Sequence, residues 1–98
     1  MTGVLSMAQE LATERVPQRL ARALLRLGEH GGRSTGEGLE IVHPITRQEL
    51  AELTGATLFT ISRLMAEWEA GGLVRTGRGR VTIVDPAGLE ATAAIQPD

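Results

Sequence analysis

Four hydrogen-bonding side chains gather in one short stretch in the second half of the chain. They are Thr57, Thr60, Ser62 and Arg63. An arginine guanidinium can donate two parallel hydrogen bonds to a guanine edge, and small hydroxyls can reach base edges or phosphate. These residue types therefore favour contact with a nucleic acid over catalysis.

Arginines flank this stretch on both sides. Arg47 stands at the expected start of a short helix, where the positive end of the helix dipole would help it to hold a phosphate. Arg78 and Arg80 lie in an expected hairpin and are predicted to follow a nucleic-acid backbone. A solvated hairpin is the alternative for those two. For Arg63 the alternative is a surface pair with Glu67, one helical turn further on.

Residues that could support an enzyme or a metal site are missing. The chain has no cysteine and no tyrosine, and it contains no Gly-rich phosphate loop after a strand and no Ser-His-Asp set. His30 and His43 stand alone in expected loops, and two isolated histidines do not make a metal site. We expect no catalytic residue, no bound metal, no cofactor and no enzymatic activity.

Composition restricts the class of protein. A chain of 98 residues with 42% hydrophobic residues fits one globular domain or part of a longer chain. The absence of cysteine, of a signal peptide and of a long apolar run predicts a cytoplasmic protein away from membranes. The net charge of -2 argues weakly against a nucleic-acid binder. However, all ten cations are arginine, and Leu58 to Arg80 holds four arginines against two acids.

Three positions predict a helix-turn-helix. Ala51 is small where two helices would cross, Gly55 suits the left-handed backbone of the turn, and Ile61 would enter the shared core. The remaining core positions are expected to be Leu50, Leu53, Leu64, Met65 and Trp68. The predicted fold is mainly α with a small antiparallel β-sheet, a winged helix-turn-helix.

Boundary signals place the elements around this motif. Thr46 and Glu49 form a capping box, and Gly71-Gly72 follows the longer helix. Helices are expected at 47–53, 57–70 and 87–94, and Asp85-Pro86 caps the last of them. Strands are expected at 73–75 and 80–84, and the wing of the winged helix is 74–84.

The first half of the chain is predicted to contain two helices, a loop and a strand. Residues 4–16 show helical apolar spacing, and Pro17 suits the first turn of a second helix, 17–27. The glycine-rich stretch 28–38 is expected to be a loop, before a short strand marked by Leu39, Ile41 and Ile45. On the second helix, Arg19, Arg22 and Arg26 could touch phosphate, although a solvated face is favoured.

The helix at 57–70 has two contrasting faces. At about 100° per residue, Ile61, Leu64, Met65 and Trp68 point inward together. Phe59 and Arg63 point the opposite way with Ala66 and Ala70. In a helix-turn-helix the N-terminal half of the exposed face enters the major groove, so this helix is the predicted recognition helix.

The stretch from Ile45 to Met65 resembles the DNA-binding motif of the Crp/Fnr family of bacterial regulators. Its sequence is ITRQELAELTGATLFTISRLM, and 19–27 and 69–83 also match that family's pattern. The resemblance implies a C-terminal winged helix at 17–94 that regulates transcription on double-stranded DNA. It also implies that 1–16 end a dimerisation helix and that 95–98 form a tail. The implied partners are DNA, a second copy of the chain and RNA polymerase.

Two positions depart from that family. Its members commonly carry a glutamate, often preceded by an arginine, where this chain has Phe59 and Leu58. The family's glutamate accepts a hydrogen bond from a cytosine amino group, which Phe59 cannot do. The family's usual half-site should therefore not be carried over. We expect Phe59 to contact a thymine methyl or to bury against a partner.

A winged helix that binds protein rather than DNA is the alternative function. Leu58 and Phe59 would be its exposed anchors. Arg63 and the arginines of the hairpin argue against it. The target sequence, the effector, the choice between activation and repression, and dimerisation of this chain alone do not follow from the sequence.

Overall fold

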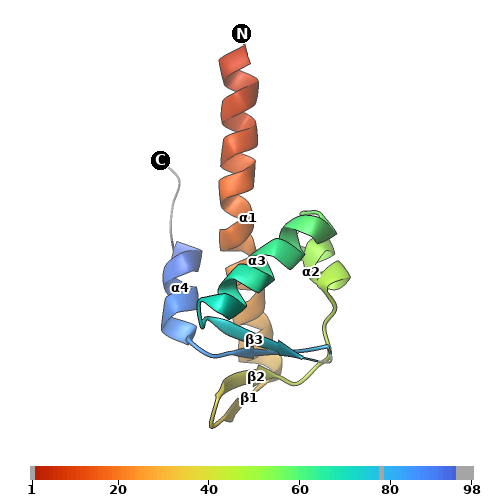
Figure 1. The fold of residues 1–98 in the computed structure, drawn as a ribbon, viewed down its shortest axis with the longest axis vertical. Coiled ribbons are helices and arrows are strands. Elements are labelled where there is room, and N and C mark those ends of the chain that lie inside the picture. Colours follow the sequence, from red (N-terminus) through yellow and green to blue (C-terminus); the bar gives the residue numbers. More distant parts are fainter. Residues whose placement is uncertain (1, 78, 95–98) are drawn as a thin grey trace.

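The computed structural model describes residues 2–77 and 79–94, with side chains from Val16 onward. These residues form four helices and one antiparallel sheet in which the strands lie in the order β1-β2-β4-β3 (Figure 1). The elements are α1 (Thr2–Gly31), β1 (Gly32–Thr35), β2 (Gly38–Ile41), α2 (Arg47–Thr54), α3 (Leu58–Ala70), β3 (Val74–Gly77), β4 (Arg80–Ile83) and α4 (Pro86–Ala94). The predicted fold class is confirmed.

Helix α1 is one continuous helix, so the predicted break before Pro17 is wrong. Proline inside a helix costs about 3 kcal/mol, because it removes one backbone hydrogen bond and crowds the preceding turn. Full burial of Leu20 and Leu24 directly after it offsets this cost at about 1.5–3 kcal/mol each. The first half of α1 extends beyond the rest of the fold (Figure 1). Within the described residues, no helix combines the length and apolarity that a membrane span needs.

The glycine-rich stretch predicted as a loop is instead the end of α1 followed by the β1–β2 hairpin. Three of its glycines, Gly28, Gly32 and Gly38, lie where an added Cβ would meet neighbouring atoms. Gly38 has φ +145°, and a Cβ there would collide with the carbonyl oxygen of Ile83 on β4. The predicted strand is also too long, because β2 ends at Ile41 and Ile45 is buried outside it.

The helix-turn-helix follows the predicted pattern closely. Thr46 and Glu49 form the capping box, in which the backbone and hydroxyl of Thr46 lower the pKa of the Glu49 carboxyl. Gly55 turns the chain with φ 70°. Thr57 lies outside α3 as its N-cap, and Gly72 (φ 79°) takes the left-handed conformation after that helix, whereas Gly71 does not.

The core lies between the helices and one face of the sheet. Ala51 and Ile61 are both buried, as predicted, together with Leu50, Leu64, Met65 and Trp68. Leu53 is an exception, because its side chain is 62% exposed. It lies at the edge of α2 and lines a surface hollow with Arg19 and Leu27 of α1, instead of pointing towards α3.

Alternation along the strands separates the two faces of the sheet. Ile41, Val81 and Ile83 are buried against the core. The neighbouring positions pair across the strands as Arg33↔Glu40, Glu40↔Thr82 and Arg75↔Thr82, which places these four side chains on the outer face. The wing is confirmed as β3 and β4, and β3 runs to Gly77, further than predicted. Asp85 caps α4 by accepting a hydrogen bond from the Gly88 amide at 3.0 Å.

Candidate nucleic-acid interface

Helix α3 has one buried face and one exposed face, as its periodicity predicts. Ile61, Leu64, Met65 and Trp68 are buried. On the opposite face Phe59 is 77% exposed, and Leu58 in the first turn is 49% exposed. Arg63, Ala66 and Ala70 are exposed on α3 as well. Burial on the inner face holds the helix in place and leaves its N-terminal outward residues available to a partner.

Hydroxyl groups close the N-terminal turn of α3. Thr57 accepts a hydrogen bond from the Thr60 amide at 3.1 Å and donates one to the Thr60 hydroxyl at 3.0 Å. The Thr60 hydroxyl keeps its own hydrogen, so it can still donate to an acceptor outside the domain. Ser62 is half-buried one position before Arg63. The structure thus brings the four predicted donors together at one end of the helix.

Arg63 pairs with Glu67 in the free protein. Its Nη1 lies 3.1 Å from the Glu67 carboxylate, and both side chains are about half exposed. The alternative contact foreseen for Arg63 therefore exists. Exposed pairs one turn apart stabilise a helix by only about 0.3–0.5 kcal/mol. A bidentate contact with a guanine can compete with it.

Arg47 and Arg80 line one cleft of about 310 Å³ between the start of α2 and the wing. Thr46 and Gly79 line the same cleft. The Ile45 amide donates a hydrogen bond to the Gly79 carbonyl at 3.0 Å, which holds the wing against the segment that leads into α2. Two of the three arginines predicted to contact the backbone thus line the same cleft, and the guanidinium of Arg80 reaches Glu40 on the outer face of the sheet. The third, Arg78, lies outside the described residues.

Glu69 connects the wing to α3. Its carboxylate accepts hydrogen bonds from the Thr76 amide at 2.8 Å and from the Thr76 hydroxyl at 3.1 Å. These bonds lower the pKa of Glu69, and the nearby charges of Arg47 and Arg75 lower it further. The carboxylate is therefore ionised at neutral pH, and β3 keeps a fixed position relative to α3. Sequence analysis counted Glu69 only as a charge, although it lies in the last turn of the predicted helix, shortly before the predicted wing.

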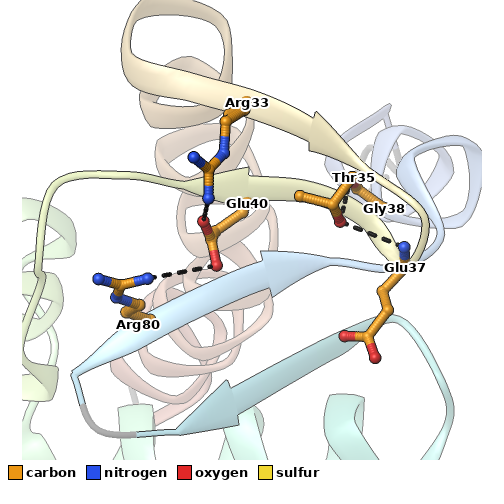
Figure 2. Close-up of polar contacts among 6 residues, drawn as sticks. All are labelled: Arg33, Thr35, Glu37, Gly38, Glu40 and Arg80. Atoms are coloured by element: carbon orange, nitrogen blue, oxygen red, sulfur yellow. Dashed lines mark hydrogen bonds and ion pairs between the residues drawn. The ribbon is translucent and has the colours of Figure 1, made fainter.

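Two further carboxylates lie beside arginines of the sheet. Glu40 contacts both Arg33 and Arg80 (Figure 2). Glu37, in the β1–β2 turn, pairs with Arg75 at 2.9 Å. Sequence analysis missed both acids because it predicted no β1 strand. Alternation of arginine and glutamate on paired strands would have been the signal.

The arginines of α1 mainly bind other parts of the domain. Arg19 donates to the Thr54 carbonyl at 2.9 Å, and Arg22 donates to the Ala93 carbonyl at 3.3 Å. They therefore connect α1 to the end of α2 and to α4. Arg26 is exposed. No group of side chains suited to a metal occurs in the part of the chain that the structure describes.

Comparison with known proteins agrees with this geometry. The model of the Crp-like helix-turn-helix domain matches residues 18–92. The transcriptional regulator SdrP of Thermus thermophilus is 34% identical over 87% of this chain, and the CRP-like cAMP-activated global transcriptional regulator of Mycobacterium tuberculosis is 33% identical over 80%. The matched segments are 42% and 35% of those proteins, so the chain spans less than half their length.

Solved structures show the same fold. A Crp/Fnr-family transcriptional regulator from Thermus thermophilus matches 98% of this chain and 49% of its own chain, with TM-score 0.76 and 27% identity. The CO-dependent transcription factor CooA from Carboxydothermus hydrogenoformans matches 93% of this chain and 42% of its own, with TM-score 0.78 and 21% identity. At that identity the second similarity concerns the fold alone.

Proposed function

The chain belongs to the family of Crp-like helix-turn-helix domains, and we propose that it binds double-stranded DNA in a sequence-specific way to regulate transcription. In this proposal α3 is the recognition helix. One observation carries this proposal above all. The N-terminal outward face of α3 exposes Phe59 and Arg63, while Ile61 on the opposite face is fully buried. A helix held in this way can enter a major groove without disturbing the core.

Each exposed residue of α3 has a proposed role. Arg63 leaves Glu67 and donates two hydrogen bonds to a guanine edge. Thr57, Thr60 and Ser62 contact base edges or phosphates near the helix start. Phe59, with Leu58 beside it, makes apolar contact with a thymine methyl, because neither side chain can accept a hydrogen bond from cytosine.

The backbone contacts come from the cleft beside the wing. Arg47 and Arg80 both line this cleft, and each is proposed to contact a phosphate of the backbone that passes it. We include Arg78 in this group by its position in the sequence. These contacts supply affinity for any sequence and little discrimination among bases.

A second copy of the chain is part of the proposal. One small module of this kind has limited affinity, and two-fold symmetric sites match dimers. The start of α1 extends beyond the domain, and its sequence has helical apolar spacing, so residues 2–16 are the proposed contact between copies (Figure 1). For the whole regulator we propose a cytoplasmic location and action on RNA polymerase.

The test is selection of bound sequences from a random duplex library, followed by a salt titration on the winner. We expect a two-fold symmetric consensus and an affinity that falls steeply with salt. No enrichment, together with binding that does not respond to salt, would overturn the proposal.

A protein-binding winged helix is the second candidate, and the exposure of Leu58 and Phe59 is what favours it. It predicts weak, salt-insensitive contact with bulk DNA. It also predicts that Phe59→Ala abolishes capture of a protein partner while heparin binding stays the same. The DNA proposal predicts steeply salt-dependent binding to both heparin and bulk duplex.

A further inference from the structure

The outer face of the sheet holds one carboxylate between two arginines. Glu40 Oε1 accepts a hydrogen bond from Arg33 Nη2 at 2.9 Å, while Glu40 Oε2 lies 3.7 Å from Arg80 Nη1. Figure 2 shows the Glu40 carboxylate between the two guanidinium groups. The Glu40 side chain is 18% exposed, whereas those of Arg33 and Arg80 are 66% and 60% exposed. The acid is thus fixed in the sheet and the two cations extend into solvent.

Strand register brings these three residues together. Arg33 and Glu40 are direct partners across β1 and β2, and Glu40 is the direct partner of Thr82 across β2 and β4. Arg80 lies two residues before Thr82, so it shares that face and meets Glu40 diagonally, within reach of a long side chain.

The two contacts of Glu40 differ in strength. The contact with Arg33 is a charge-assisted hydrogen bond of ordinary length. The contact with Arg80 is too long for a hydrogen bond and is a long ion pair whose cation is exposed, so it contributes little to stability. Arg80 can therefore leave Glu40 at small cost. Arg33 would still hold the carboxylate in place after Arg80 has left.

We propose that Glu40 sets how strongly the wing holds DNA, by competing with phosphate for Arg80. This inference rests on the proposed function, because it needs Arg80 to contact the backbone. In the free protein the carboxylate reduces the effective charge of Arg80, and in the complex it repels the nearby phosphates. Both effects weaken binding to every sequence, while the base contacts of α3 are unaffected. Glu40 thereby lowers the affinity for the selected and the random duplex alike and leaves their ratio unchanged.

The test measures binding of Glu40→Gln to a selected duplex and to a random duplex over a range of salt. Glutamine can still accept the hydrogen bond from Arg33, so the fold should persist, and urea unfolding checks this. We expect binding to both duplexes to tighten roughly 2- to 5-fold, the range for release of a weak ion pair. The salt slope should steepen by up to about 0.9. The ratio of specific to non-specific affinity should stay the same.

Two matched variants separate this effect from a change in overall charge. Glu90→Gln removes the same charge from an exposed position on α4, and we expect little effect. In an Arg80→Gln background, Glu40→Gln should lose most of its effect. Equal gains in duplex affinity from Glu40→Gln and Glu90→Gln would overturn the inference, and so would a full gain from Glu40→Gln in the Arg80→Gln background. Neither result would affect the proposed function, because the unmodified chain would still bind duplex. Failure of the unmodified chain to bind any duplex would overturn the proposed function, and this inference with it.

Discussion

The outward face of α3 and the outer face of the sheet both carry arginines, but in different surroundings. On α3, Arg63 lies one turn after the exposed Phe59 and close in sequence to hydroxyls, with one acid one turn further on. On the sheet, the described arginines each lie beside a carboxylate of the β1–β2 hairpin. Varied chemistry can distinguish base edges, whereas a surface of arginines and carboxylates alone mainly adjusts attraction to phosphate. The difference suggests that α3 supplies specificity and the wing supplies affinity.

The largest expected effect concerns the inner face of α3, on which the outer face depends. Ile61→Ala should lower the free energy of unfolding by about 2–5 kcal/mol, because Ile61 is fully buried and its loss leaves a cavity. Urea unfolding followed by circular dichroism measures this. Phe59→Ala is the control and should change stability by less than about 0.5 kcal/mol. Equal losses would mean that both faces of α3 are packed.

Removal of Arg63 tests the specificity side of the comparison. Arg63→Ala should cost about 1–3 kcal/mol at one base position and relax the preference there. Competition between the selected duplex and single-base variants measures the change. Loss of the Glu67 pair has little effect on stability, because both side chains are exposed. An intact preference in Arg63→Ala would show that α3 does not supply specificity.

Removal of Arg80 tests the affinity side. Arg80→Gln should weaken binding to all duplexes alike and reduce the salt slope by about 0.9, the value for one phosphate contact. Arg26→Gln, an exposed arginine on α1, is the matched control for charge. A loss confined to the selected sequence would instead give the wing a role in base recognition.

The smallest expected effect concerns Glu69, which joins the two regions. Its folded pKa lies below the usual 4.5, so the folded state favours the carboxylate. The stability that this contributes is present above about pH 4.5 and is lost as the pH falls through the lowered pKa. Urea unfolding at pH 7 and at pH 3 should show a smaller pH dependence for Glu69→Gln than for the unmodified chain. Identical pH dependence would exclude the link between Glu69 and Thr76.

Local signals predicted the helix-turn-helix well. The capping box at Thr46, the left-handed turn at Gly55 and the buried Ile61 each follow from neighbouring residues. The continuous α1 did not follow, because the cost of Pro17 is offset by burial against elements far away in the chain. The β1–β2 hairpin did not follow either, since Gly38 is required by contact with β4.

The same distinction applies to the candidate site. Helical periodicity predicted the exposed donors of α3, because one turn of sequence determines which face they share. Glu40 and Glu69 could not be found in this way, since each acts across strands or between α3 and β3. Leu53 was wrongly placed in the core. Periodicity shows that this position is apolar, but it does not show whether another element covers it.

The most direct test of the account is sequence selection from a random duplex library with Phe59→Glu beside the unmodified chain. Glutamate at this exposed position can accept a hydrogen bond from cytosine, which phenylalanine cannot do. The account predicts a changed consensus at one position in each half-site, with the rest of the site retained. An unchanged consensus would contradict the claim that the outward face of α3 recognises the DNA sequence.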